Sequence, residues 1–333
     1  MYWAYDTEGA FNLFDMCVIS YSSCLFILFM DFYSQIAKNK RNTYFLFLAF
    51  FLMIGVLAYI ISIVLEYVVG IGFIFFFTIF GFLTILFAVI SYYSSDKIVT
   101  AVSGAKEAPK EQFSQLHNIV EELCLASGLP KPRIFLINDT AINAFATGRD
   151  PMHAVVCVTM GCLTRLTRDQ LQGVIAHELS HIRNYDVRTM TIATVLVGIA
   201  VMLSDLLIRM FWFGGLRGSG NSKDSGGFII VIIVVSILLA ILTPIIAKLI
   251  TLAISRKREF VADASAIEMT RNPDGLASAL EVISKDVEVL EVANKATAHL
   301  YIANPLKGQK LWMKSLFSTH PDINVRIAKL RGH

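Results

Sequence analysis

The sequence predicts an α+β protein in which four membrane-spanning helices accompany a mainly helical soluble domain with a small sheet. Of its 333 residues, 55% are apolar and only 17% are charged, and the mean hydropathy is +0.61. Soluble domains average about 25% charged residues, and disordered chains are poor in large apolar residues, so neither class fits. The apolar residues also occur in long blocks. The net charge of +3 is too small to indicate nucleic-acid binding.

Four apolar stretches are long enough to cross a membrane, for which a helix needs about 20 residues. Glu66 separates the first two stretches, and a Gly-rich loop at 214–227 separates the last two. The third stretch contains Asp205 and Arg209, which are four apart and can pair on one helix face. The predicted spans are 42–63, 67–95, about 189–213 and 228–247.

Basic residues flank these spans asymmetrically. The two loops on one side carry only Arg217 and Lys223. The other side carries Lys38, Lys40, Arg41, Lys97, Lys106, Lys110, Arg183, Arg188, Arg256, Lys257 and Arg258. Because Lys and Arg are retained on the cytoplasmic side, both termini and both soluble segments are expected in the cytoplasm. This predicts a multi-pass protein of the cytoplasmic (inner) membrane.

Residues 1–29 form an atypical N-terminal extension. The segment Met16–Met30 is uncharged but short, and it lacks the basic start and cleavage site of a signal peptide. It is either a membrane-surface segment or an extension outside the working protein, with Met30 as the true start. The rest of the chain divides into spans one and two (30–95), a first soluble part (96–188), spans three and four (189–254) and a second soluble part (255–333).

The soluble parts contain clear helix and strand patterns. Apolar periodicity predicts a helix over Gln112–Ser127, and β-branched runs predict strands over Arg133–Asn138, Asn143–Thr147 and Ala154–Met160. Thr167 and Gln170 have the spacing of a capping box, which starts a further helix. If this helix continues into the third span, it ties its residues to the membrane. Helices are also expected over Glu259–Met269 and from Asn272-Pro273 onward.

The helix that follows Thr167 carries the sequence His-Glu-Leu-Ser-His at 177–181. His177 and His181 are four apart, so both imidazoles lie on one helix face and can bind one ion. Glu178 lies about 100° around the helix from His177. It is therefore beside such an ion, where it can take a proton from a bound water.

A catalytic zinc ion needs three protein ligands, so a third must come from elsewhere. Glu259 and Asp263 are four apart on the next predicted helix. One of them can bind the metal while the other accepts a hydrogen bond from a ligand histidine. The alternative is a solvated acidic face beside the basic run Arg256–Arg258.

His320 lies in the sequence Ser-Thr-His-Pro, six residues before Arg326. Both side chains can donate hydrogen bonds to an oxyanion. By sequence physics alone, a loop histidine that caps a helix is the better interpretation of His320. Asp139 follows a predicted strand and is interpreted as a turn former.

From Met30 to Arg331 the chain resembles the HtpX membrane-bound zinc metalloproteases, which are relatives of the CAAX prenyl protease. Four motifs occur in order, and the set is more specific than any one of them. Asn143–Gly148 resembles the edge strand beside the active-site cleft, and His177–His181 resembles the metal helix. Arg256–Asp263 resembles the third-ligand segment, and Thr319–Pro321 with Arg326 resembles the C-terminal motif.

The resemblance implies a gluzincin-type zincin protease domain, formed by the two soluble parts, with one Zn²⁺ per chain. It implies that His177, His181 and Glu259 bind the zinc and that Glu178 is the general base. Asp263 then supports a ligand histidine.

The resemblance also implies how a peptide is held. His320 and Arg326 would stabilise the oxyanion, and the substrate would lie extended along the edge strand, adding a strand to the sheet. The strand residues concerned are Asn143, Ala144, Phe145 and Ala146.

The implied function is zinc-dependent endoproteolysis in the stress response, in quality control of damaged or misfolded membrane proteins. The expected partners are polypeptide substrates and the lipid bilayer, with no nucleic acid. Self-cleavage is also expected, with Gly104–Glu111 and the C-terminal segment as candidate sites.

Three alternatives are weaker. A prenyl-protein processing protease commonly has more spans than four. A scaffold with structural zinc usually offers four protein ligands. A transporter would carry polar residues near mid-membrane, where only Asp205 qualifies.

Overall fold

A computed structural model describes residues 72–192, 256–286, 300–302 and 321–332, with isolated positions between 37 and 66, at 233–237 and at 288–290. The elements are mainly helical, with one small sheet, as expected for an α+β protein. In chain order they are α2 Phe73–Tyr93, α3 Ser95–Val102, β1 Lys106–Glu107, α4 Ser114–Ser127, β2 Arg133–Ile137, β3 Ala144–Gly148, the 3-10 helix η1 Pro151–His153, β4 Ala154–Thr159, α5 Met160–Arg165, α6 Arg168–Arg183, α9 Arg256–Thr270, α10 Pro273–Lys285 and α12 Ile323–Leu330.

The sheet has the strand order β1-β2-β4-β3. β2 runs parallel to β4, and β1 and β3 pair antiparallel to their neighbours. The three predicted strands are confirmed to within one residue at either end. β1 was not predicted because its two residues, Lys106 and Glu107, carry no alternating pattern.

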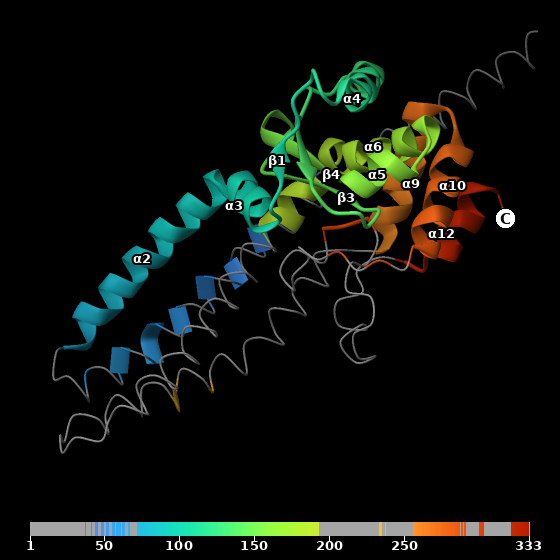
Figure 1. The fold of residues 1–333 in the computed structure, drawn as a ribbon. Helices are drawn as coiled ribbons and strands as arrows, with labels where there is room; N and C mark the ends of the chain where they lie inside the picture. The colour runs from blue at the N-terminus through green and yellow to red at the C-terminus, as the bar shows by residue number, and fades with distance from the viewer. Residues whose placement is uncertain are drawn as a thin grey trace, which may run out of the picture.

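Helix α6 is the centre of the packing: it contacts β3, α4, α9 and α10 (Figure 1). Its apolar side chains join one buried core with those of the sheet, α4 and α10. The approach to α10 is so close that a Cβ on Gly173 would lie 2.6 Å from the backbone nitrogen of Leu276. A glycine at this position therefore lets α10 press directly against the helix that carries the two histidines.

The two helix starts that were predicted from capping residues are confirmed. Thr167 Oγ1 accepts from the backbone N–H of Gln170, and Gln170 Oε1 accepts from the backbone N–H of Thr167, which is a complete capping box. Asn272 caps α10, with Pro273 in its first turn.

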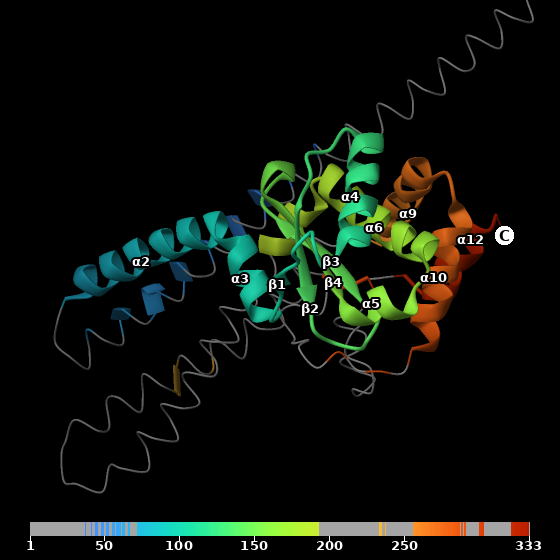
Figure 2. The same cartoon turned by 45° about the horizontal axis from the view of Figure 1, so that its top comes forward.

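Among the described residues, one helix is long enough and apolar enough to cross a membrane, judged by length and composition. This helix is α2. It matches the second predicted span, and it extends away from the sheet and its surrounding helices (Figures 1 and 2). Its large side chains, such as Ile74 and Phe82, are exposed. The described positions within 42–63 are helical, whereas most of 189–213, most of 228–247, and the extension 1–29 lie outside the described residues.

Helix α6 does not continue directly toward the third predicted span. It ends at Arg183, Asn184 and Tyr185 form a turn, and residues 186–192 are helical again. Thr191, in this second segment, shares a hydrogen bond with Thr147 of β3 (2.9 Å between hydroxyl oxygens) and accepts from the Gly148 N–H. The start of the third predicted span is therefore packed on the sheet.

Candidate metal centre and active site

The two histidines of α6 point at the same place. His177 Nε2 and His181 Nε2 lie 3.2 Å apart, and both side chains are buried. The cause is local: the capping box fixes where α6 begins, and the spacing of four puts both rings on one face.

Helix α9 brings a carboxylate to the same point. Glu259 Oε2 lies 3.6 Å from His177 Nε2, and Glu259 Oε1 lies 3.5 Å from His181 Nε2. The donors of a tetrahedral zinc ion, at about 2.0–2.1 Å from the metal, lie about 3.3 Å from one another. The observed separations are close to that value: 3.2 Å between the two Nε2 atoms, and 3.6 and 3.5 Å from these atoms to the Glu259 carboxylate, with a different oxygen facing each histidine. Two imidazoles and one carboxylate are also a ligand set of catalytic zinc sites. These residues form the one group with suitable ligand atoms in the part of the chain that the structure describes.

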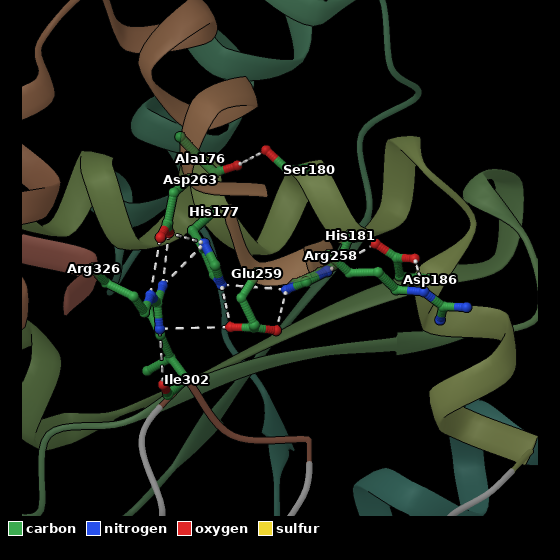
Figure 3. Close-up of polar contacts among 10 residues, drawn as sticks. All are labelled: Ala176, His177, Ser180, His181, Asp186, Arg258, Glu259, Asp263, Ile302 and Arg326. Atoms are coloured by element: carbon green, nitrogen blue, oxygen red, sulfur yellow. Dashed lines mark hydrogen bonds and ion pairs between the residues drawn. The ribbon is translucent and has the colours of Figure 1, made fainter. Parts of the chain in front are cut away.

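Each imidazole has a carboxylate on its other nitrogen. His177 Nδ1 lies 2.9 Å from Asp263 Oδ1, and His181 Nδ1 lies 3.1 Å from Asp186 Oδ2. A carboxylate at Nδ1 places that proton on Nδ1 and directs the Nε2 lone pair to the metal. The four side chains are therefore arranged as in a metal site with its outer partners present (Figure 3).

Two buried arginines compensate this negative charge. Arg326, on α12, donates to both oxygens of Asp263 from Nε (2.9 Å) and Nη2 (2.7 Å). Arg258, one residue before Glu259, places Nε 3.5 Å from Asp186 Oδ1. Both guanidinium groups are less than a tenth exposed. Charges buried in this way are tolerated when they are paired.

Burial lowers the pKa of His177, as does the charge of Arg326, but hydrogen bonds to Asp263 and Glu259 outweigh both and raise the pKa to about 9. Burial raises the pKa of Asp263, whereas its contacts with His177 and Arg326 bring it below the usual range. The pKa of His181 is raised too: burial opposes the shift, and the hydrogen bond that His181 donates to Asp186 favours it. The carboxylates thus stabilise the protonated form of both histidines. A bound divalent cation would replace this positive charge.

Glu178 is also buried, on the same helix. Burial and then the negative charge of Glu178 raise the pKa of Cys157, which lies in the middle of β4. The influence of Glu178 on Cys157 indicates that its carboxylate is near the sheet. Burial lowers the pKa of Arg326, whereas the charges of Asp263, Glu259 and Glu178 raise it, so the Glu178 carboxylate also acts on the arginine of the metal site.

The predicted substrate strand is β3, at the edge of the sheet. The Asn143 carbonyl accepts from the Thr159 N–H (3.0 Å). Because bonded pairs alternate along an antiparallel ladder, the backbone of Phe145 faces β4, while that of Ala144 and Ala146 faces the outer edge.

Part of that outer edge is covered by the chain itself. The Ile302 N–H donates to the Ala144 carbonyl (3.0 Å), and the ring of Tyr301 packs edge-on against Phe145 with 5.0 Å between centroids. Ile302 also accepts from Arg326 Nη1 at 3.5 Å. The segment 300–302 therefore lies between the edge strand and the metal-site residues.

The structure thus brings together His177, Glu178, His181, Glu259, Asp263 and Arg326, with β3 close by. His320 lies outside the described residues. Asp139 forms a turn, as predicted: its Oδ1 accepts from the Ala141 N–H (2.9 Å).

Sequence reasoning missed Asp186 and Arg258. The available signal was their position close to the motif residues: Asp186 follows His181 by five residues, and Arg258 directly precedes Glu259.

The chain is similar to known proteins over most of its length. Residues 110–333 match Peptidase family M48. A Protease HtpX homolog from Dictyoglomus turgidum is 45% identical over 302 residues, covering 90% of this chain and 94% of the relative. Another, from Caldanaerobacter subterraneus subsp. tengcongensis, is 42% identical over 300 residues, covering 90% of this chain and 97% of the relative. The crystal structure of S. mikatae Ste24p aligns with a TM-score of 0.42 at 19% identity, covering 82% of this chain and 61% of that one.

The family match spans most of the chain, and it includes every residue of the metal site. The relatives extend the similarity to nine-tenths of the sequence and carry protease names. The scaffold and transporter alternatives are thereby excluded. The chain belongs to peptidase family M48 and is a metalloprotease similar to the HtpX proteases.

Proposed function

We propose that this protein is a zinc-dependent endopeptidase of the cytoplasmic membrane, with one zinc ion held by His177, His181 and Glu259. The observation that carries the proposal is the pair of Nε2 atoms 3.2 Å apart, each 3.5–3.6 Å from an oxygen of the Glu259 carboxylate, with a second carboxylate behind each imidazole. A structural zinc site would use a fourth protein ligand. The described residues offer three, the number that catalytic zinc sites use, and we propose that substrate or water takes the fourth position.

When bound, zinc would act as a Lewis acid that polarises a water molecule and the scissile carbonyl. Glu178 accepts the proton of the attacking water and delivers it to the departing amine nitrogen. A carboxylate suits both steps because it can gain and lose one proton without leaving the site. Its burial shields the transfer from bulk water.

We assign Arg326 to the metal centre itself. Its Nε and Nη2 are bonded to Asp263, and its Nη1 lies 3.5 Å from Glu259 Oε2. The guanidinium therefore fixes the carboxylate that orients His177 and adds positive charge beside a ligand. His320 is the proposed donor to the oxyanion, on the basis of its sequence motif. The expected result is that His320→Ala lowers kcat and leaves zinc affinity unchanged.

We propose that the substrate pairs with the outer edge of β3. The outward backbone groups of Ala146 would pair with an extended peptide. At Ala144 the peptide would compete with Ile302 for the carbonyl. Substitution Ala146→Pro removes the outward N–H without removing a bond to β4. It is expected to raise KM more than it lowers kcat.

The membrane part of the proposal is four spans, with the active site in the cytoplasm. It is supported by α2 and by the asymmetry of Lys and Arg. Single cysteines placed in the loop 214–227 of a cysteine-free variant should react with a membrane-impermeant reagent from outside the cell. Cysteines placed on exposed positions of α4 should react only after lysis. The reverse pattern would contradict the orientation.

We further propose that the substrates are damaged or misfolded membrane proteins and that the enzyme cleaves itself. Both follow from the HtpX likeness and from an active site joined to the membrane helices. Self-cleavage predicts fragments ending within Gly104–Glu111 or the C-terminal segment when zinc is added to purified protein. An intact band after days with zinc would contradict it.

The decisive experiment is casein cleavage by purified protein in detergent, prepared with chelator and then supplied with zinc. Wild type should cut only with zinc. Glu178→Gln should bind zinc normally and lose about 10²–10⁴-fold in rate. The matched control is Glu268→Gln, an exposed glutamate of α9, which should retain activity. Equal cutting by wild type and Glu178→Gln would overturn the assignment of the base, and tight zinc with an inert wild type would overturn the peptidase.

A further inference from the structure

The turn after α6 has a specific consequence for His181. In an uninterrupted helix, residues five apart lie about 140° apart around the axis, so Asp186 would face away from His181. The helix is interrupted instead, because Tyr185 adopts φ 60°, a left-handed conformation that is uncommon for residues other than glycine. The turn brings Asp186 back, with its Oδ2 3.1 Å from His181 Nδ1.

Asp186 is also held from the opposite helix. Arg258 Nε lies 3.5 Å from Asp186 Oδ1, and both groups are buried. Arg258 directly precedes Glu259 on α9, so one helix supplies both the third ligand and the cation that holds Asp186. The contact therefore connects α9 to the helical segment that follows α6, beside the metal site (Figure 3).

The arrangement repeats the one on His177. There Asp263 contacts Nδ1 and is held by Arg326. We propose that Asp186 and Arg258 form a second positioning pair, which fixes the ring of His181 so that its Nε2 faces Glu259 and the metal. The proposal rests on the proposed zinc site. Neither residue is catalytic, since both act through His181.

The test measures zinc binding by chelator competition and the visible absorption spectrum of the Co²⁺-substituted full-length protein. Loss of an outer-shell partner lowers metal affinity by about 10–100-fold. Asp186→Asn should show a loss of this size and a changed cobalt spectrum. Asp186→Glu retains the charge that Arg258 needs but moves it by one methylene, so it should keep the fold and show a smaller loss. Thermal unfolding of the metal-free variants identifies any that fail to fold.

The matched control is Glu268→Gln. Glu268 pairs with Arg183 between the same two helices (3.2 Å) but is exposed and touches neither histidine. It should leave zinc affinity and the cobalt spectrum unchanged. A folded Asp186→Asn with wild-type affinity and spectrum would overturn the positioning role while wild-type zinc binding remained intact. A wild type that binds no stoichiometric zinc would instead overturn the metal site on which both proposals depend.

Discussion

The charge pairs around the metal-site histidines and those on the outer face of α4 have the same chemistry in different surroundings. Asp263 and Arg326 are almost completely buried. Glu121 of α4 pairs with Lys110 (3.0 Å) and Lys131 (2.6 Å), and all three side chains are at least a third exposed. The distances are similar, so distance does not separate the two groups.

Burial makes the difference. In water, each partner of an exposed pair is well solvated alone, and the pair contributes little. In the core, removing one partner leaves a charge that water cannot reach. The buried pair therefore holds its carboxylate in one position, which is what a ligand histidine requires. The following predictions test this contrast.

The largest effect is expected from Glu259→Gln. The change removes the anionic ligand and leaves an amide beside two imidazoles. Zinc affinity should fall by more than about 100-fold, beyond the range for outer-shell partners, and casein cleavage should be lost. Isothermal titration calorimetry of zinc into the metal-free protein measures the affinity. Wild-type affinity in this variant would remove Glu259 from the ligand set.

The next effect is expected from Arg326→Met, which leaves Asp263 buried without its guanidinium. The metal-free protein should lose about 3–5 kcal/mol in free energy of unfolding. The matched control is Arg331→Met, which removes the exposed partner of Glu281 at the end of the same helix. It should leave unfolding unchanged within error. Similar losses for both arginines would show that burial is not the deciding factor.

A smaller, graded effect is expected with pH. The pKa of His177 in the metal-free fold is raised from 6.5 to about 9. This contribution to stability is complete below pH 6.5 and is lost as pH rises through 9. Zinc must displace the same proton, so its affinity should rise over that window, by up to about tenfold per pH unit for each proton released. Zinc affinity and the free energy of unfolding of the metal-free protein are measured over the same pH range. The prediction is contradicted if both rise or both fall with pH.

The smallest effect is expected from Glu121→Gln. Lys131 and Lys110 lower the pKa of Glu121 to about 2, but the side chain is exposed and solvated. Zinc affinity, casein cleavage and unfolding at pH 7 should match wild type within error. A clear loss in any of them would mean that surface pairs matter here as much as buried ones.

Much of this protein is encoded locally and was predictable from the sequence. The strands, the capping box at Thr167 and the start of α10 at Asn272 depend on neighbouring residues, and the structure confirms them. The position of His177, His181 and Glu178 on one helix follows from spacing alone. The sheet order, with β4 between β2 and β3, did not follow, because strand pairing is decided by contacts between distant segments.

The sequence by itself determined which residue types could hold a metal and on which helix they stand. Only the tertiary structure decided that Glu259 faces the Nε2 atoms and that Asp263 faces Nδ1, a choice that spacing left open. It alone identified Asp186 and Arg258, because a left-handed turn at Tyr185 overrides the helical spacing that sequence reasoning assumes. Helical periodicity reports which residues share a face. The packing of α6 against α9 decides which atoms meet.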